Sequence, residues 1–483
     1  MNKHAIKIFQ VNTNDISGGA QRVAWNLFRS YRARGCRSWL AVGRKVSGDP
    51  DVLTLVHGAE RFGWARFWWG MHSLLRPLDA NGRFSRLARR LAEPEALLDY
   101  FRGIEDFHFP GTWQLLGLAP TPPDILHCHN LHGGYFDLRA LSWLSRQVPT
   151  VVTLHDAWLL SGHCAHSLDC ERWRIGCGQC PDLTLYPSVR HDATAYNWRR
   201  KLDIYRNGRL YVATPSRWLM NKVEGSMLAL AIAEARVVPN GVDLDLFHPT
   251  TDRKEVRASL GLPHDAKIVL FAANGICANI WKDYRTLRAA ISRVAAPADG
   301  QRLFFVALGE DGPSERVGQA EIHFVPYQIV PEAVARYYQA ADLYIHAARA
   351  DTFPNTVLEA LACGTPVIAT AVGGIPEQVK GLRTDGGSLN SHRREEATGL
   401  LTSPGDAEEL KLRIEQVLGD EPLRLQLSIN AAADARRRFR LGQQVDAYLS
   451  WYQEILRSFD TERRHAQALR SGGWWASEQA GVK

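Results

Sequence analysis

Long apolar runs are missing from this 483-residue sequence. No stretch reaches the roughly 18 apolar residues that a membrane-spanning helix needs. Residues 1–15 also lack the apolar core and the small-residue cleavage site of a signal peptide. The sequence therefore predicts a protein that stays in the cytoplasm. Its eight cysteines would then be mostly reduced, so clustered cysteines suggest a metal site before disulfides.

Several ligand-binding signatures are missing as well. The sequence contains no G-x-G-x-x-G and no G-x-x-x-x-G-K-[S/T], which argues against a dinucleotide enzyme and a P-loop enzyme. It contains no zinc finger and no basic region with heptads, so we expect no nucleic-acid partner. The net charge of +7 fits anionic partners such as nucleotide phosphates or an acidic membrane surface, but does not choose among them.

Short apolar runs alternate with helical patterns along the chain. This rhythm predicts parallel sheets whose two faces are covered by helices. The predicted strands are residues 6–11, 125–129, 151–154, 210–213, 236–238, 267–272, 303–308, 322–325, 343–346 and 366–369.

The strands fall into two groups separated by a proline- and glycine-containing hinge at residues 239–249. One hydrophobic core seldom grows past roughly 250–300 residues, so two domains are expected. We predict an α/β architecture of two Rossmann-like domains, residues 1–245 and 246–460, that face each other across a cleft. Residues 461–483 are predicted to be a disordered tail.

The strongest local signal is the segment 350–369, ADTFPNTVLEALACGTPVIA. Asn355 is expected to cap a helix that runs to about Cys363 and is ended by Gly364. The helix is mostly apolar and therefore buried, so Glu359 must be paired or must serve a ligand. The helix N-terminus is a natural seat for a diphosphate, which leaves Glu359 within reach of a ribose. Taken alone, a buried glutamate is more often paired with a structural arginine.

The surrounding sequence favours the ligand. Segment 350–369 resembles the acidic-x7-Glu signature of the retaining, family 4 type GT-B glycosyltransferases, which include sucrose synthases and many bacterial polysaccharide enzymes. VGGIPE at 372–377 and PNGVD at 239–243 also match. The resemblance implies transfer of a sugar, with retention, from a UDP- or GDP-sugar to a glycan or lipid-linked acceptor. It further implies chemistry without a cofactor, and it suggests bacterial surface or exopolysaccharide synthesis of the colanic-acid type.

The resemblance also implies roles for single residues. Glu359 would hold the donor ribose, and Asp351 would lie beside the transferred sugar. The sequence departs from the family at two positions, because the first acid is usually glutamate and because Cys277 stands where an arginine is usual. The implied catalytic residues are Asp351, His155 and Lys282, and the implied donor-binding residues are Gly18, Gly19, Lys282, Phe353, Pro354, Asn355, Thr356 and Glu359.

Four of these positions also have a physical interpretation of their own. Lys282 would stabilise the charge that develops on the leaving diphosphate, although alone it reads as a solvated lysine. Gly18 and Gly19 follow the first strand and lack a Cβ, so a ligand can approach the backbone, yet glycine pairs are common in ordinary turns. His155 follows a strand at its carboxyl end, where parallel sheets bind ligands.

Four cysteines lie within a short insert at residues 160–182. The spacing of Cys164, Cys170, Cys177 and Cys180 predicts a structural zinc site with four thiolate ligands. Disulfides and an iron–sulfur cluster are the alternatives. Similar inserts occur in the colanic-acid-type subgroup, so we expect this one to shape the acceptor side of the cleft.

Residues 61–90 combine aromatic side chains with seven arginines and a single acid, Asp79. This composition is typical of a segment that contacts a membrane interface, and equally of packing beneath a cationic surface. Two other functions stay open on the sequence: a nucleotide-sugar-binding protein without turnover, and a membrane-docked scaffold.

Overall fold

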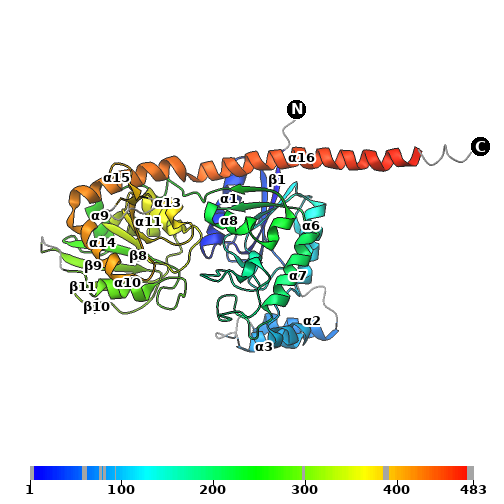
Figure 1. The fold of residues 1–483 in the computed structure, drawn as a ribbon, viewed down its shortest axis with the longest axis horizontal. Helices are drawn as coiled ribbons and strands as arrows, with labels where there is room; N and C mark the ends of the chain where they lie inside the picture. The colour runs from blue at the N-terminus through cyan, green and yellow to red at the C-terminus, as the bar shows by residue number, and fades with distance from the viewer. Residues whose placement is uncertain are drawn as a thin grey trace, which may run out of the picture.

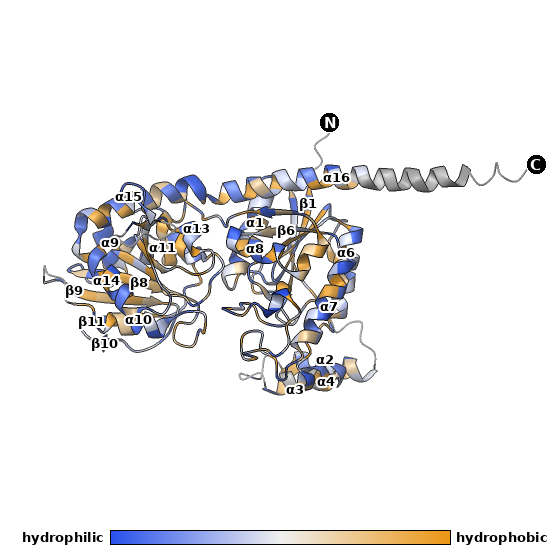
Figure 2. Cartoon of the chain, in the orientation of Figure 1, coloured by the Kyte–Doolittle hydropathy of each residue, from blue (hydrophilic) through white to orange (hydrophobic). Residues whose placement is uncertain are grey.

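The computed structural model describes residues 5–56, 63–75, 79, 83–92, 94–295, 300–383 and 391–475. Two α/β lobes lie next to each other, and one long helix, α16 (Leu441–Trp475), runs along the first of them (Figure 1). Figure 2 shows apolar strands inside each lobe and polar helical faces outside. Among the described residues, no helix combines the length and the apolarity that crossing a bilayer requires.

The first lobe contains a seven-stranded parallel sheet in the order β3-β2-β1-β4-β5-β6-β7. Its central strands β4, β5 and β6 are buried along their whole length, because helices cover both faces of the sheet. Its elements are β1 (Lys7–Asn14), α1 (Gly19–Ala33), β2 (Arg37–Arg44), β3 (Val52–Thr54), α5 (Leu115–Leu118), β4 (Ile125–Cys128), α6 (Ala140–Gln147), β5 (Thr150–Thr153), α7 (Thr194–Arg206), β6 (Leu210–Thr214), α8 (Arg217–Glu224) and β7 (Ile232–Val237).

The second lobe contains a nine-stranded sheet in the order β10-β11-β9-β8-β12-β13-β16-β14-β15. All its strand pairs are parallel except β10 with β11. Its elements are α9 (Arg253–Ser259), β8 (Ala266–Ala272), α10 (Tyr284–Ile291), β9 (Arg302–Leu308), β10 (Glu315–Val317), β11 (Ala320–Val325), α11 (Pro331–Ala340), β12 (Leu343–His346), α12 (Asn355–Ala362), β13 (Val367–Thr370), α13 (Ile375–Gln378), β14 (Gly381–Leu382), β15 (Ser391–His392), β16 (Gly399–Thr402), α14 (Ala407–Gly419) and α15 (Glu421–Arg438).

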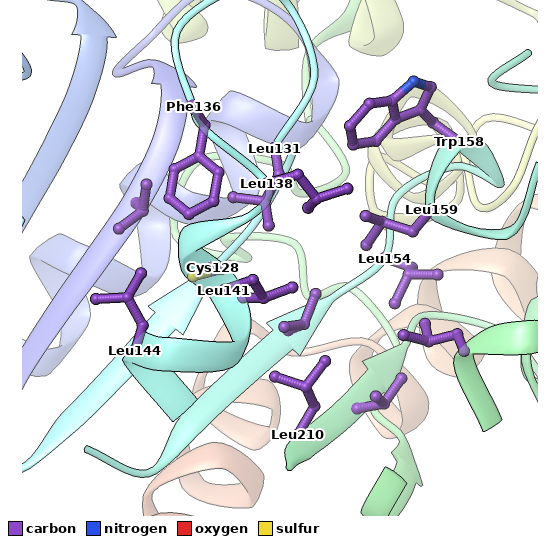
Figure 3. Packing of buried hydrophobic residues seen from close by; sticks show 14 of the residues in the cluster. Cys128, Leu131, Phe136, Leu138, Leu141, Leu144, Leu154, Trp158, Leu159 and Leu210 are labelled. Carbon is purple, nitrogen blue, oxygen red and sulfur yellow. The ribbon is translucent and has the colours of Figure 1, made fainter. Parts of the chain in front are cut away.

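The core of the first lobe forms where α6 and the loops after β4 and β5 pack on one face of the sheet. Figure 3 shows side chains from these elements meeting, with Leu141 and Leu144 of α6 above Leu210 of β6. All three are fully buried. Burying a leucine stabilises the fold by roughly 1.5–3 kcal/mol, so this cluster holds the carboxyl ends of β4 and β5 in place.

A group of helices projects from the first lobe between β3 and β4. It consists of α2 (Gly63–Leu75), α3 (Arg83–Ala92) and α4 (Pro94–Arg102), at the lower edge in Figure 1. The indole N–H of Trp64 donates to the carbonyl of Leu91 at 2.8 Å, which ties α2 to α3.

Helix α16 corrects two expectations about the end of the chain. Tyr448, Trp451 and Tyr452 are fully buried against β1, β4, β5 and α1, so the predicted second domain does not extend to residue 460. The chain returns to the first lobe near Arg440, which pairs with Val242 of the hinge. The helix also continues to Trp475 through most of the predicted disordered tail, because the segment is rich in good helix formers such as Arg, Gln, Ala and Leu. Residues 476–483 lie outside the described residues.

Candidate active site

The acidic motif lies at the carboxyl edge of the second sheet, where β12 ends and α12 begins. Lys282 Nζ is 2.6 Å from Asp351 Oδ2, and His346 Nε2 is 3.3 Å from the same oxygen. Burial raises the pKa of Asp351, but Lys282 and His346 lower it more, so the pKa lies well below its usual value. Asp351 is therefore ionised at neutral pH, next to a cation.

His346 is a site residue that the sequence analysis missed. Its side chain is completely buried, and its Nδ1 lies 3.0 Å from the hydroxyl of Tyr344 and 3.4 Å from that of Thr356. Burial and Lys282 lower its pKa to about 4 despite Asp351, so the imidazole is neutral at pH 7. The signal that could have found it is the one used for His155, a histidine at the carboxyl end of a parallel strand.

Glu359 lies on α12 at a cavity of 470 Å³ between the lobes. Tyr338 donates a hydrogen bond to its Oε2 at 3.0 Å, and Glu359 forms no ion pair with another described residue. Burial raises its pKa, although Tyr338 and Arg22 lower it. No arginine among the described residues forms an ion pair with Glu359, so the alternative of a structural ion pair is not supported. The carboxylate lines the cavity, whose wall also includes residues of α1 in the first lobe.

Asn355 does not cap α12. The N-cap is Pro354, which has no side-chain donor or acceptor, and Asn355 is the first helical residue. Its side chain instead crosses the cleft and donates to the carbonyl of Gly19 at 3.1 Å, while Asn240 Nδ2 donates to its Oδ1 at 3.2 Å. The predicted glycine turn, with Gly18 at φ 100°, therefore lies directly against the predicted donor helix.

In the described part of the chain, three buried side-chain atoms near the start of α12 lack a hydrogen-bond partner. Within the described residues, the buried atoms Thr352 Oγ1, Asn240 Oδ1 and Gln378 Oε1 have no hydrogen-bond partner. An unpaired buried polar atom is costly, so three of them around one helix N-terminus indicate a place for a polar ligand. Phe353 is different, because its ring is buried against Phe439 and only its backbone can serve such a ligand.

The pair Gly373–Gly374 packs closely against the backbone of Asp351 and Thr352. Gly373 has φ 58°, and a Cβ there would lie 1.7 Å from the carbonyl oxygen of Asp351. Gly373→Ala is therefore expected to lower the free energy of unfolding by about 3 kcal/mol or more. Gly405→Ala, at φ 78° in open space, should cost only about 1–2 kcal/mol for its left-handed backbone. Urea denaturation of both variants measures the difference, and equal losses would contradict the close approach.

His155 is part of a buried chain of polar groups in the first lobe. Its Nε2 lies 3.1 Å from Nδ1 of His129, whose Nε2 lies 3.0 Å from the side-chain oxygen of Gln10. Burial lowers the pKa of His155 to about 4, although Asp156 raises it. A neutral imidazole at this strand end can make hydrogen bonds to sugar hydroxyls without adding charge.

The sequence comparisons agree with this geometry. The family model described as Glycosyltransferase Family 4 matches residues 17–246, and the model described as Glycosyl transferases group 1 matches residues 252–434. The chain is 31% identical over 360 residues to the D-inositol 3-phosphate glycosyltransferase of Mycolicibacterium smegmatis, covering 70% of this chain and 72% of that protein. The chain belongs to the family 4 and group 1 glycosyltransferases.

Two further comparisons, one with a related sequence and one with a solved structure, agree with this family and its fold. This glycosyltransferase is 27% identical over 379 residues to the Escherichia coli K12 protein named as a colanic acid biosynthesis glycosyl transferase, WcaC, covering 76% of this chain and 83% of that protein. Its fold is that of Anabaena HepE, solved with UDP and glucose, with a TM-score of 0.58, 17% identity and coverage of 93% and 100%. The predicted GT-B architecture of two facing Rossmann-like lobes is thus confirmed.

The zinc prediction is not supported in this glycosyltransferase. All four insert cysteines are described as free thiols, and no described group of three or more His, Cys, Asp or Glu residues is arranged to hold a metal ion. Burial raises the pKa of Cys164 to about 11 and that of Cys177 to about 12. The insert is ordered by other means, since its Trp173 is buried and Ala165 donates to the carbonyl of Tyr186 at 2.8 Å.

Cys277 supplies no cation to the site. It is exposed, and its backbone N–H donates to Glu310 Oε2 at 3.1 Å. Lys282 is therefore the cation that contacts Asp351 in the described structure.

Proposed function

We propose that this glycosyltransferase moves a sugar from a nucleoside diphosphate sugar onto a glycan or lipid-linked acceptor, with retention of the anomeric configuration. The observation that carries the proposal is the cluster of Lys282, Asp351 and His346 beside the α12 N-terminus, with Glu359 one turn along the helix at the interlobe cavity. Amide groups at a helix N-terminus and a lysine together suit a diphosphate, and a buried carboxylate suits ribose hydroxyls.

The chemistry follows from this arrangement. The bond between the anomeric carbon and the diphosphate breaks with its electron pair on the diphosphate, whose charge Lys282 and the α12 amides stabilise. The acceptor oxygen forms the new bond from the same face, and its proton passes to the departing phosphate oxygen. Asp351 and His155 hold the sugar hydroxyls during this exchange, and the buried His346 positions Asp351. Asp351 is shorter than the usual glutamate and keeps its charge, because Lys282 pairs with it.

Relatives support the substrate classes. HepE was solved with UDP and glucose, and WcaC is named for colanic acid synthesis. We therefore propose a UDP- or GDP-sugar as donor and a role in bacterial surface or exopolysaccharide assembly.

The test is the release of nucleoside diphosphate from UDP-, GDP-, dTDP- and ADP-sugars, measured together with donor binding over long incubations. Binding and slow hydrolysis of one donor support the proposal. Binding without any release, even with acceptors present, favours the alternative of a nucleotide-sugar-binding protein. Absence of all nucleotide-sugar binding rejects the donor site.

We also propose that the α2–α3 surface contacts a membrane, where a lipid-linked acceptor would be found. No residue of α2 is buried, and Trp64, Phe67 and Leu74 are each 61% exposed. Phe84 of α3 is 68% exposed. Arginines on both helices complement anionic headgroups, which is the combination that binds at an interface.

The membrane contact predicts a loss of vesicle binding in Trp64→Ser/Phe67→Ser. We expect at least about a tenfold drop in cosedimentation with vesicles of phosphatidylglycerol and phosphatidylcholine, because two interfacial aromatic anchors are removed. The control is Leu425→Ser/Ile429→Ser, which removes two similarly exposed apolar side chains from α15. Equal binding by both variants would remove this surface from the proposal.

A further inference from the structure

A carboxylate of the second lobe binds the start of a helix in the first lobe. Glu377 of α13 accepts a hydrogen bond from the Arg217 N–H through Oε2 and one from the Trp218 N–H through Oε1, each at 2.8 Å. These are the first two residues of α8. Backbone N–H groups at a helix N-terminus have no partner inside the helix and carry partial positive charge. The carboxylate therefore makes two charge-assisted hydrogen bonds between the lobes.

The rest of this helix start is satisfied within the first lobe. Ser216 is the N-cap of α8, and its hydroxyl accepts from the N–H of Leu219 at 3.3 Å. The two N–H groups before Leu219 are those that Glu377 binds, so the second lobe completes the cap. The lobes also approach closely beside this contact, because a Cβ on Gly374 would lie 2.8 Å from the Cβ of Ser216.

Helix α13 is itself held in place on the second lobe. Arg438 donates to the carbonyls of Glu377 and Gln378 at 2.9 and 2.8 Å. Gln378 Nε2 donates at 3.0 Å to the carbonyl of Pro354, which is the N-cap of α12. Two adjacent side chains of α13 thus reach the N-termini of two helices, α12 in the second lobe and α8 in the first.

Helix α8 carries side chains that reach the Asp351 cluster. Trp218 and Lys222 line a pocket of 400 Å³ that also contains Asp351. Lys222 Nζ donates to Ser167 Oγ at 3.1 Å and lies 5.0 Å from the ring centre of Trp173, which ties the insert at residues 160–182 to the helix. Ser167 lines the same pocket. The position of α8 therefore sets the position of the first-lobe wall that faces Asp351.

We propose that Glu377 is a positioning residue that holds the two lobes in the arrangement that sugar transfer requires. The inference rests on the proposed transferase function and adds a residue that acts through α8 rather than on the substrate. In that function Glu359, Lys282 and the α12 amides of the second lobe bind the nucleoside diphosphate. The sugar is also contacted by His155 of the first lobe. Loss of the contact between Glu377 and α8 should therefore lower transfer and leave nucleoside diphosphate affinity nearly unchanged.

The first test removes a hydrogen-bond donor from α8. Arg217 is the first helical residue, where proline is well tolerated, and Ser216 before it has the extended backbone, φ −138° and ψ 152°, that precedes proline. Arg217→Pro deletes the N–H that Glu377 binds, and we expect transfer to fall about tenfold, the usual contribution of one hydrogen bond to a charged group. Arg217→Ala removes the same side chain but keeps the N–H, so its transfer should stay normal.

The second test changes the carboxylate. Glu377→Gln keeps the shape but turns an amide NH₂ toward one of the two N–H groups. Transfer should again fall about tenfold, and small-angle X-ray scattering should show a larger radius of gyration as the lobes separate. Glu224→Gln changes another carboxylate of α8, an exposed one paired with Arg217 at 3.3 Å, and should alter neither quantity. Glu377→Gln should add little to Arg217→Pro, since both break one contact, and two independent losses of stability would instead add.

Three measurements on the full chain decide between the outcomes. Transfer uses the donor found by nucleotide release, isothermal titration uses its nucleoside diphosphate, and scattering is recorded without ligand. Normal transfer with an unchanged radius of gyration in Glu377→Gln, or equal transfer by Arg217→Pro and Arg217→Ala, would overturn the proposal. An equal loss of transfer and nucleoside diphosphate affinity in Glu377→Gln would also overturn it, because Glu377 would then belong to the donor site. A wild-type chain that binds no nucleoside diphosphate rejects the proposed function instead, and scattering still tests the contact.

Discussion

Lys282→Ala is expected to lower sugar transfer by about 10²–10³-fold, the usual cost of removing one group that stabilises charge in the transition state. The lysine contacts Asp351 at 2.6 Å and His346 at 3.3 Å. Without it, the leaving diphosphate would meet an unbalanced carboxylate. The pKa of Asp351 should also rise, because its principal cation is gone. Nucleoside diphosphate release under saturating donor measures the loss, and Lys282→Arg should recover part of it.

Loss of stability must be separated from loss of chemistry in this variant. Removing one partner of a buried ion pair costs about 3–5 kcal/mol. Lys380 pairs with the buried Asp434 at 2.9 Å in the same lobe. Lys380→Ala is therefore a control for the loss of a lysine ion pair, in which Asp434 keeps its contacts with Arg437 and Arg438. Its transfer rate per folded molecule should stay normal. If both variants lose transfer equally, Lys282 is structural.

Glu359→Ala is expected to abolish measurable donor binding and turnover. A hydrogen bond to a charged group contributes about 1.5–3 kcal/mol, and a carboxylate that holds two ribose hydroxyls makes two of them, which corresponds to about 100-fold or more in donor affinity. Glu359→Gln keeps the shape and one acceptor and should show an intermediate loss. Isothermal titration with the nucleoside diphosphate measures each affinity.

The control for this variant is Glu332→Ala, since Glu332 lines the same cavity but is exposed. Donor affinity should be unaffected there. Near-normal activity of Glu359→Ala would show that the ribose is held elsewhere and would reject the assignment of the α12 carboxylate.

The sequence predicted most strands of the two sheets well, but it did not predict the shortest strands or the position of helix α16. Buried parallel strands are short apolar runs between turns, so the strands at 267–272 and 343–346 were found almost to the residue. The two-residue strands β14 and β15 are too short to form a pattern. Helix α16 reads as an ordinary amphipathic helix, and nothing local in it specifies which lobe its aromatic face will cover.

The candidate site was predictable where a motif and a strand end coincided. Lys282 contacts Asp351, and Asn355 contacts Gly19 across the cleft. The roles that the resemblance implies for these residues and for Glu359 stay predictions. His346 was missed because its neighbours in sequence are apolar and only the folded sheet brings it to Asp351. The zinc site predicted from the cysteine spacing is not supported, because no described group of three or more His, Cys, Asp or Glu residues is arranged to hold a metal ion. Cys177 lies at φ 54° beside two glycines, and its thiol accepts from the Gly162 N–H at 3.3 Å.

The aromatic face of α16 has a consequence for synthesis of the chain. Ile8, Leu27 and Tyr31 leave the ribosome long before Tyr448, Trp451 and Tyr452, which complete the cluster that buries them. Domains usually fold one after another as they emerge. Here the first lobe stays open on one face until α16 has been made, so that face needs protection from aggregation during translation. A fragment that ends at the hinge would carry this face exposed.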